Sequence, residues 1–197
     1  MSATGIYRSF SDLTRAALKH AVGEQGLTLT DEATQSLMDA YNGLAVFPEI
    51  PAALEHVRAA GDKVDAYIFS NGTDEMVAGS VKTSPELAKF ADLFGEPSRQ
   101  VTVVSTQAFK PDPRTYAHLV DSVGMSGKPG SVWVVTANPF DALGCRAAGL
   151  NSAWIDRAGR GWVDSLGDLI GLTPTIVVGG VDEAVQRILS GRDAGLS

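Results

Sequence analysis

The stretch that decides the fold is VDAYIFSNG, at residues 64–72. Its first six residues are mostly apolar and include β-branched and aromatic side chains, which predicts a buried strand. Ser70, Asn71 and Gly72 follow, and these residue types favour a tight turn at a point where a helix can begin. A strand that ends in a polar turn and continues as a helix is the unit from which parallel α/β sheets are built.

The same unit recurs at two further places along the chain. VTVVS at 101–105 leads to FKPDP at 109–113, and SVWVV at 131–135 leads to TANPFD at 136–141. In each case a hydroxyl, amide, ammonium or carboxylate group stands where a strand ends. Because the carboxyl ends of parallel strands converge on one crevice, we expect Ser70, Lys110 and Asp141 to line a common ligand site.

The larger, second part of the chain alternates between strand and helix patterns. We predict strands near 64–69, 101–105, 131–136, 151–156 and 175–179, and helices near 73–82, 86–93, 113–123, 139–148 and 181–189. This alternation indicates right-handed crossovers and therefore a doubly wound, Rossmann-like α/β fold with a parallel sheet.

The first part of the chain is helical. Apolar residues recur at helical spacing in two segments, one starting after Ser9 or Ser11 and one at Thr30. The connector FPEIP at 47–51 carries two prolines, which we expect to exclude helix there. A short helix follows at 52–60.

These patterns divide the chain into three parts. We predict a helical domain at 1–47, a sheet domain at 48–190 and a disordered tail at 191–197. With 197 residues and 44% hydrophobic content, the chain can bury a substantial core.

Charge and composition exclude several classes of function. The net charge of −7 argues against nucleic acid and anionic membranes as partners. The single cysteine, Cys145, excludes an internal disulfide, and we expect it to be a small buried residue. The three histidines lie far apart and lack metal-ligand spacing. Neither a membrane span nor a signal-peptide pattern is present, so we expect a cytoplasmic protein. We also expect no metal and no cofactor, and we leave a homodimer open.

Taken one by one, the polar residues at the strand ends also have simpler explanations. Ser70 and Asn71 suit an anion beside the first N–H groups of a helix, but they equally suit an ordinary turn. Lys110, held in a rigid turn by Pro111, is either a fixed cation beside a carboxylate or a solvated loop lysine. Tyr116 by itself is typical of a half-buried helix residue.

Asn138 and Asp141 are three residues apart, and Pro139 between them suits the first turn of a helix. Both side chains then lie on one face of the helix start. One interpretation is a cap, with Asn138 at the N-cap and Asp141 favoured by the helix dipole. The other is a contribution to the ligand site, and the two interpretations are compatible.

Taken together and in this order, Ser-Asn-Gly at 70–72, Lys110-Pro111 and Asn138-x-x-Asp141 resemble the haloacid dehalogenase superfamily. The resemblance is greatest to the type II L-2-haloacid dehalogenases. It implies a hydrolase that dehalogenates 2-haloacids through an ester with an Asp side chain, with a small-molecule carboxylate as substrate.

The resemblance also implies a role for each matching residue. Ser70 and Asn71 would hold the substrate carboxylate and the leaving halide. Lys110 would keep the nucleophile ionised, and Tyr116 would lie near the active site. Thr136 stands where the family usually has Ser, and would line the substrate site with a hydroxyl of its own.

The neutral side chain of Asn138 separates two branches of the superfamily. Magnesium-dependent members carry an acidic residue at the matching position, because a hard cation needs anionic oxygen ligands. The resemblance therefore implies a metal-free site in which Lys110, Asn138 and Asp141 are the catalytic residues.

One part of the family pattern has no counterpart in this chain. In the family, an Asp at the end of the first strand is the nucleophile, and an apolar strand with such an Asp is missing here. Met1 already falls within the matching helical cap, and Asp12, Asp31 and Asp39 follow no apolar strand. We therefore expect a truncated chain that is inactive as given. Two alternatives remain open: a non-enzymatic binding module derived from the superfamily, and a fragment of a phosphatase of the same superfamily.

Overall fold

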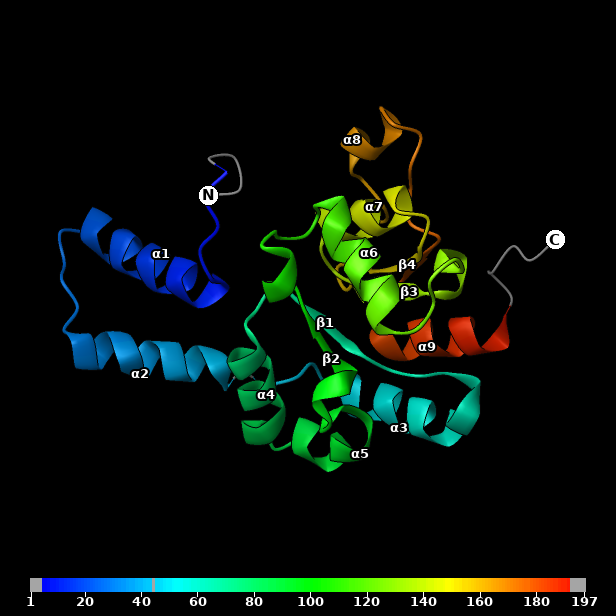
Figure 1. Cartoon of the computed structure of the whole chain (residues 1–197), viewed down its shortest axis with the longest axis horizontal. Helices are drawn as coiled ribbons and strands as arrows, with labels where there is room; N and C mark the ends of the chain where they lie inside the picture. The colour runs from blue at the N-terminus through cyan, green and yellow to red at the C-terminus, as the bar shows by residue number, and fades with distance from the viewer. Residues whose placement is uncertain (1–4, 44, 192–197) are drawn as a thin grey trace. The chain divides into compact units, whose positions relative to one another are not determined.

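The computed structural model of the protein describes residues 5–43 and 45–191 (Figure 1). Its contacts divide the chain into two compact units, unit 1 with residues 1–46 and 67–108 and unit 2 with residues 47–66 and 109–197. The predicted division near residue 47 into a helical domain and a sheet domain stays a prediction. Residues 192–197 of the predicted tail lie outside the described residues.

Two helices open unit 1. Helix α1 spans Phe10–Glu24 and helix α2 spans Asp31–Asn42. The Ser9 hydroxyl accepts a hydrogen bond from the Asp12 N–H at 3.1 Å, and the Thr30 hydroxyl caps α2 in the same way. These caps confirm the predicted helix starts, since they satisfy N–H groups that have no partner within the first turn.

A parallel pair of strands carries the Ser-Asn-Gly turn. Strand β1, Ile68–Ser70, pairs with strand β2, Gln100–Thr102. Between them lie α4 (Asp74–Thr83), the 3₁₀ helix η3 (Leu87–Phe90), α5 (Ala91–Phe94) and the 3₁₀ helix η4 (Pro97–Arg99) (Figure 1). Val77 and Val81 are the buried residues of α4.

Strand β2 ends earlier than the sequence pattern predicts. The predicted strand continues to residue 105, yet pairing stops at Thr102, opposite the last residue of β1, Ser70. The Val103 N–H still donates to the Ser70 carbonyl at 3.2 Å, and the 3₁₀ turn η5 (Val104–Thr106) follows. A strand is only as long as its hydrogen-bonding partner, and the local pattern does not reveal where the partner ends.

Unit 2 contains a three-stranded parallel sheet. Its strands are β3 (Trp133–Thr136), β4 (Asn151–Ile155) and β5 (Ile176–Val178), in the order β3-β4-β5. The core between this sheet and α9 consists of small and β-branched side chains: Ala153, Ile155, Ile176, Val178 and Ala184.

Helices connect and cover these strands. They are α3 (Ile50–Ala60), η2 (Gly61–Lys63), α6 (Pro113–Ser122), η6 (Pro129–Ser131), α7 (Pro139–Ala147), α8 (Ser165–Asp168) and α9 (Val181–Ser190). Helix α7 follows β3 and packs on β3 and β4, while α3 packs along α9 (Figure 1). Helix α8 was not predicted, because four residues are too few to show a helical period.

The prolines of the connector do not exclude helix as we expected. Helix α3 begins at Ile50 and contains Pro51 in its first turn, where the missing N–H of proline has no partner to lose. The connector is held to the rest of unit 2 by Arg157. Its guanidinium pairs with Glu49 at 2.6 Å and lies 3.7 Å from the centre of the Phe47 ring.

The predicted fold class is confirmed: the chain is an α/β protein with parallel strands. The single sheet that we expected is wrong in detail, because the strands form two parallel sheets, one in each unit. In the described part of the chain, no helix is both long and apolar enough to cross a membrane.

Candidate active site

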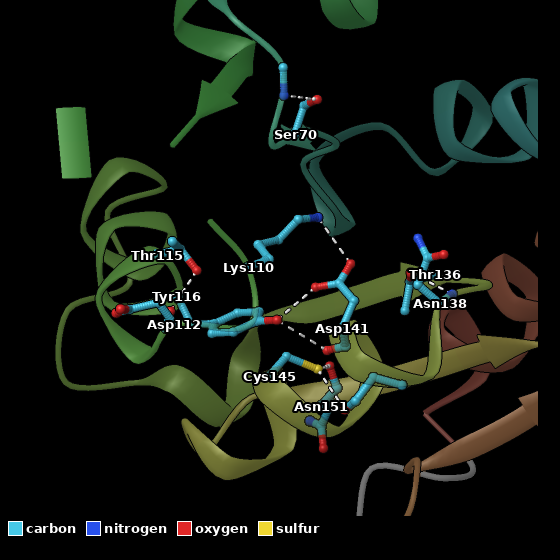
Figure 2. A network of polar contacts seen from close by, with 12 residues as sticks. Ser70, Lys110, Asp112, Thr115, Tyr116, Thr136, Asn138, Asp141, Cys145 and Asn151 are labelled. Atoms are coloured by element: carbon cyan, nitrogen blue, oxygen red, sulfur yellow. Dashed lines mark hydrogen bonds and ion pairs between the residues drawn. The ribbon is translucent and has the colours of Figure 1, made fainter. Parts of the chain in front are cut away.

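Three of the predicted site residues meet in unit 2. The Lys110 ammonium lies 2.9 Å from Oδ2 of Asp141, and the Tyr116 hydroxyl donates to Oδ1 of the same carboxylate at 2.8 Å (Figure 2). Only 10% of the Lys110 side chain and 3% of the Asp141 side chain are exposed. Each carboxylate oxygen of Asp141 therefore has its own donor, the charged ammonium for Oδ2 and the neutral phenol for Oδ1. Water is almost excluded from this cluster.

Local sequence places each member of this cluster. Pro113 occupies the first turn of α6, and the Asp112 side chain caps that helix by accepting from the Arg114 N–H at 2.9 Å. One turn later, Tyr116 points into the protein and is fully buried, not half-buried. Asp141 lies in the first turn of α7, and its carboxylate accepts the hydrogen bond of Tyr116 from α6 (Figure 2).

The neighbours of Asp141 are held in their protonated forms. Burial, and then the negative charge of Asp141, raise the pKa of the Tyr116 phenol well above its usual range. The same two causes raise the pKa of the Cys145 thiol to about 12. Cys145 is fully buried, as predicted. Tyr116 therefore keeps its proton and donates a hydrogen bond to Asp141 at neutral pH.

Gly144 makes this arrangement possible, and the sequence analysis did not identify it. A Cβ at this position of α7 would lie 2.5 Å from the Tyr116 hydroxyl oxygen and 2.8 Å from Cβ of Pro111. Helices α6 and α7 can therefore approach closely only because residue 144 has no side chain. The available signal was a glycine inside an otherwise helical pattern, which often has a packing reason.

Thr136 and Asn138 lie at the end of β3. Thr136 is buried, and its hydroxyl accepts a hydrogen bond from the Asn138 N–H at 3.1 Å. Asn138 occupies the N-cap position of α7, but its exposed side chain makes no capping hydrogen bond. The Asp141 side chain points towards Lys110 and Tyr116. The side chains of Asn138 and Asp141 therefore do not cap α7 as the capping interpretation predicts.

Ser70 and Asn71 belong to unit 1. The Ser70 hydroxyl accepts from the Gly72 N–H at 2.9 Å, so the turn interpretation holds (Figure 2). Both residues also line a cavity of about 340 Å³. The expectation that they share a crevice with Lys110 and Asp141 stays a prediction.

Within the described ranges, no three His, Cys, Asp or Glu side chains are grouped so that they could hold a metal ion. The described part of unit 2 presents a fixed, buried cation at Lys110, a buried phenol at Tyr116 and an exposed amide at Asn138.

Known proteins match the chain over most of its length. A family model described as haloacid dehalogenase-like hydrolase matches residues 2–149. The chain belongs to this family. The resemblance inferred from the Ser-Asn-Gly, Lys-Pro and Asn-x-x-Asp motifs is confirmed.

The relatives of this chain include proteins that are named as haloacid dehalogenases. Haloacetate dehalogenase H-2 of Moraxella sp. (strain B) is 30% identical over 184 residues, which are 93% of this chain and 75% of that protein. (S)-2-haloacid dehalogenase 1 of Pseudomonas sp. (strain CBS-3) is 31% identical over 156 residues. That match covers 79% of this chain and 64% of the relative, which is less than two thirds of its length.

A solved structure gives the same result. The crystal structure of the L-2-haloacid dehalogenase RSc1362 superposes with a TM-score of 0.78 at 26% identity, over 92% of this chain and 73% of that one. The solved structure and the family model thus agree that the chain belongs to the haloacid dehalogenase-like hydrolases.

Filling the space at Gly144 should destabilise the protein. We expect Gly144→Ala to lower the free energy of unfolding by about 1–3 kcal/mol, because the new methyl group overlaps Tyr116 and Pro111. Gly79→Ala in α4 is the control, since nothing lies within 4 Å of its Cβ. It should be neutral or stabilising by up to about 1 kcal/mol. Equal urea midpoints for the two variants would contradict the close approach of α6 and α7.

Removing the cation from the buried pair should cost more than removing one from an exposed pair. We expect Lys110→Met to lower the free energy of unfolding by about 3–5 kcal/mol, because Asp141 is left buried without its partner. Arg114→Met breaks the exposed pair with Asp112 and should cost less than about 1 kcal/mol. The double variant Lys110→Met/Asp141→Leu should recover most of the loss. If it is no more stable than Lys110→Met, the buried charge is not the cause.

Alkaline pH should destabilise the protein partly through Cys145. The folded thiol has a pKa of about 12 and an ordinary thiol 9.0, so between these values only the unfolded chain loses the proton. The thiol's contribution to the free energy of unfolding is fully present below pH 9.0 and is lost as the pH rises towards 12. The loss is about 1.4 kcal/mol per pH unit. Urea titrations of the natural protein and Cys145→Ala across this range should give a shallower decline for the variant. Parallel declines would refute the assignment.

Proposed function

We propose that the protein takes part in the hydrolytic dehalogenation of a small 2-halocarboxylate. In this reaction a carboxylate oxygen attacks C2 of the substrate, and the halide leaves with the electron pair of the carbon–halogen bond. Water then hydrolyses the ester, which releases the 2-hydroxy acid and a proton and restores the carboxylate. The observation that supports this proposal is the buried cluster of Lys110, Tyr116 and Asp141, in a chain of this family.

Lys110 would supply positive charge that does not have to reorganise during the reaction. Its ammonium is fixed by Asp141, and 10% of its side chain is exposed. A cation in such a setting favours the ionised form of a nearby carboxylate and stabilises negative charge that develops there. Tyr116 and Asp141 act as positioning residues, because they hold Lys110 in place and do not face solvent.

Asp141 is not a suitable nucleophile. Both of its oxygens accept hydrogen bonds from side chains, and its exposed fraction is 2%. An attacking carboxylate needs at least one oxygen that can approach carbon. We therefore propose that the nucleophile is not part of the cluster, and that the 197-residue chain alone does not complete the first step.

The remaining groups would bind and orient the reactants. Ser70 and Asn71 present a hydroxyl and an amide at the start of α4, where helix N–H groups favour an anion such as the substrate carboxylate or the halide. Asn138 presents an exposed amide at the start of α7, suited to holding the water that hydrolyses the ester.

Chloride release tests this proposal. The chain alone should release no chloride from L-2-chloropropionate, whereas a version extended by an N-terminal strand that ends in Asp should release it. In the extended protein, Lys110→Ala should reduce the rate by at least ~100-fold, as for other fixed electrostatic groups. Lys128→Ala removes an exposed lysine and serves as the control. An extended protein that folds, binds carboxylates and never releases halide would make this chain a binding module instead.

A further inference from the structure

The cavity of unit 1 is large and mostly apolar. Its volume of about 340 Å³ falls within the range of small-molecule sites. Polar groups come from the Ser-Asn-Gly turn, Ser80 and the Tyr41 hydroxyl. The rest of the lining is apolar or aromatic: Phe10, Tyr41, Ile68, Met76, Val77, Val81 and Leu87.

The polar end of this cavity can bind a carboxylate. Ser70 Oγ accepts from the Gly72 N–H, and its own hydroxyl proton can still be donated to a ligand oxygen. The turn leads into the ten-residue helix α4, whose N-terminal dipole favours negative charge. Asp74 and Glu75 of the first turn do not line the cavity, and Asp74 is engaged by the Thr102 hydroxyl.

The apolar end has more room than a short haloacid uses. At about 30 Å³ for each water-sized group, the cavity accommodates roughly ten such groups. The side chain of L-2-chloropropionate is a single methyl group. Burial of each further methylene against these walls contributes favourable transfer free energy.

Two residues can adapt the cavity to its ligand. Met76 projects from α4, and its unbranched thioether side chain adjusts to irregular shapes. Tyr41 of α2 lines the cavity while 43% exposed, so it lies at the rim. Neither residue belongs to the Lys110 cluster or to the motifs that identify the family.

We propose that this cavity binds the apolar side chain of a larger 2-substituted carboxylate, of pentyl or phenyl size, with the carboxylate at Ser70 and Asn71. The proposal rests on the proposed function and specifies its substrate class. Tyr41 and Met76 are then specificity-determining residues that set the preferred length of the side chain.

Binding of halogen-free acids to the 197-residue chain tests this proposal without turnover. In calorimetric titrations with acetate, butyrate, hexanoate and 3-phenylpropionate, each added methylene should raise the association constant by about two- to fourfold. Met76→Trp should fill the cavity and remove the dependence on length, while Met125→Trp, at a methionine outside the cavity, should retain it. Tyr41→Ala opens the rim of the cavity and should weaken hexanoate binding without changing acetate binding. This second variant tests the proposal even if Met76→Trp fails to fold.

The possible outcomes separate this inference from the proposed function. Equal, weak binding of all four acids would overturn the cavity assignment and leave dehalogenation untouched. Hexanol binding as tightly as hexanoate would overturn the carboxylate position at Ser70 and Asn71. Length-dependent binding by a chain whose extended version releases no halide would support the cavity and reject the dehalogenase proposal.

Discussion

Burying the carboxylate of Asp141 inside unit 2 requires a cation beside it, and Lys110 supplies that cation at 2.9 Å. The pair links the loop that follows unit 1 to the start of α7. Tyr116 completes the carboxylate's hydrogen bonds from α6, and Gly144 allows α6 to come close enough for it to do so. Charge, hydrogen bonding and helix packing thus depend on one another, which leaves the ammonium fixed before any ligand arrives.

Much of this arrangement could be predicted from local sequence. The caps at Ser9 and Thr30, and Pro139 in the first turn of α7, depend on residues within one helical turn of each other. The family motifs pointed to Lys110 and Asp141 for the same reason, because each motif is a short segment just before or at the start of a helix. Local patterns are sufficient where local contacts decide the structure.

The remaining features depend on distant partners. β2 stops at Thr102 because β1 stops at Ser70, although the apolar pattern itself continues. Tyr116 is fully buried because a helix 25 residues away brings Asp141 to its hydroxyl. The cavity beside Ser70 includes Phe10 from α1, which no spacing rule connects with the Ser-Asn-Gly turn. Features of this kind appear only when the tertiary contacts are known.

Cys145 lies beside the Asp141 cluster and is the only cysteine among the 197 residues. Its side chain is fully buried, and its sulfur lies 3.2 Å from the carbonyl oxygen of Ala142 within α7. A thiol-specific reagent can reach this position only when α7 separates from its neighbours. Each labelled molecule therefore records one such separation, so the natural sequence already contains a reporter for how often the helix that carries Asp141 opens in the folded protein.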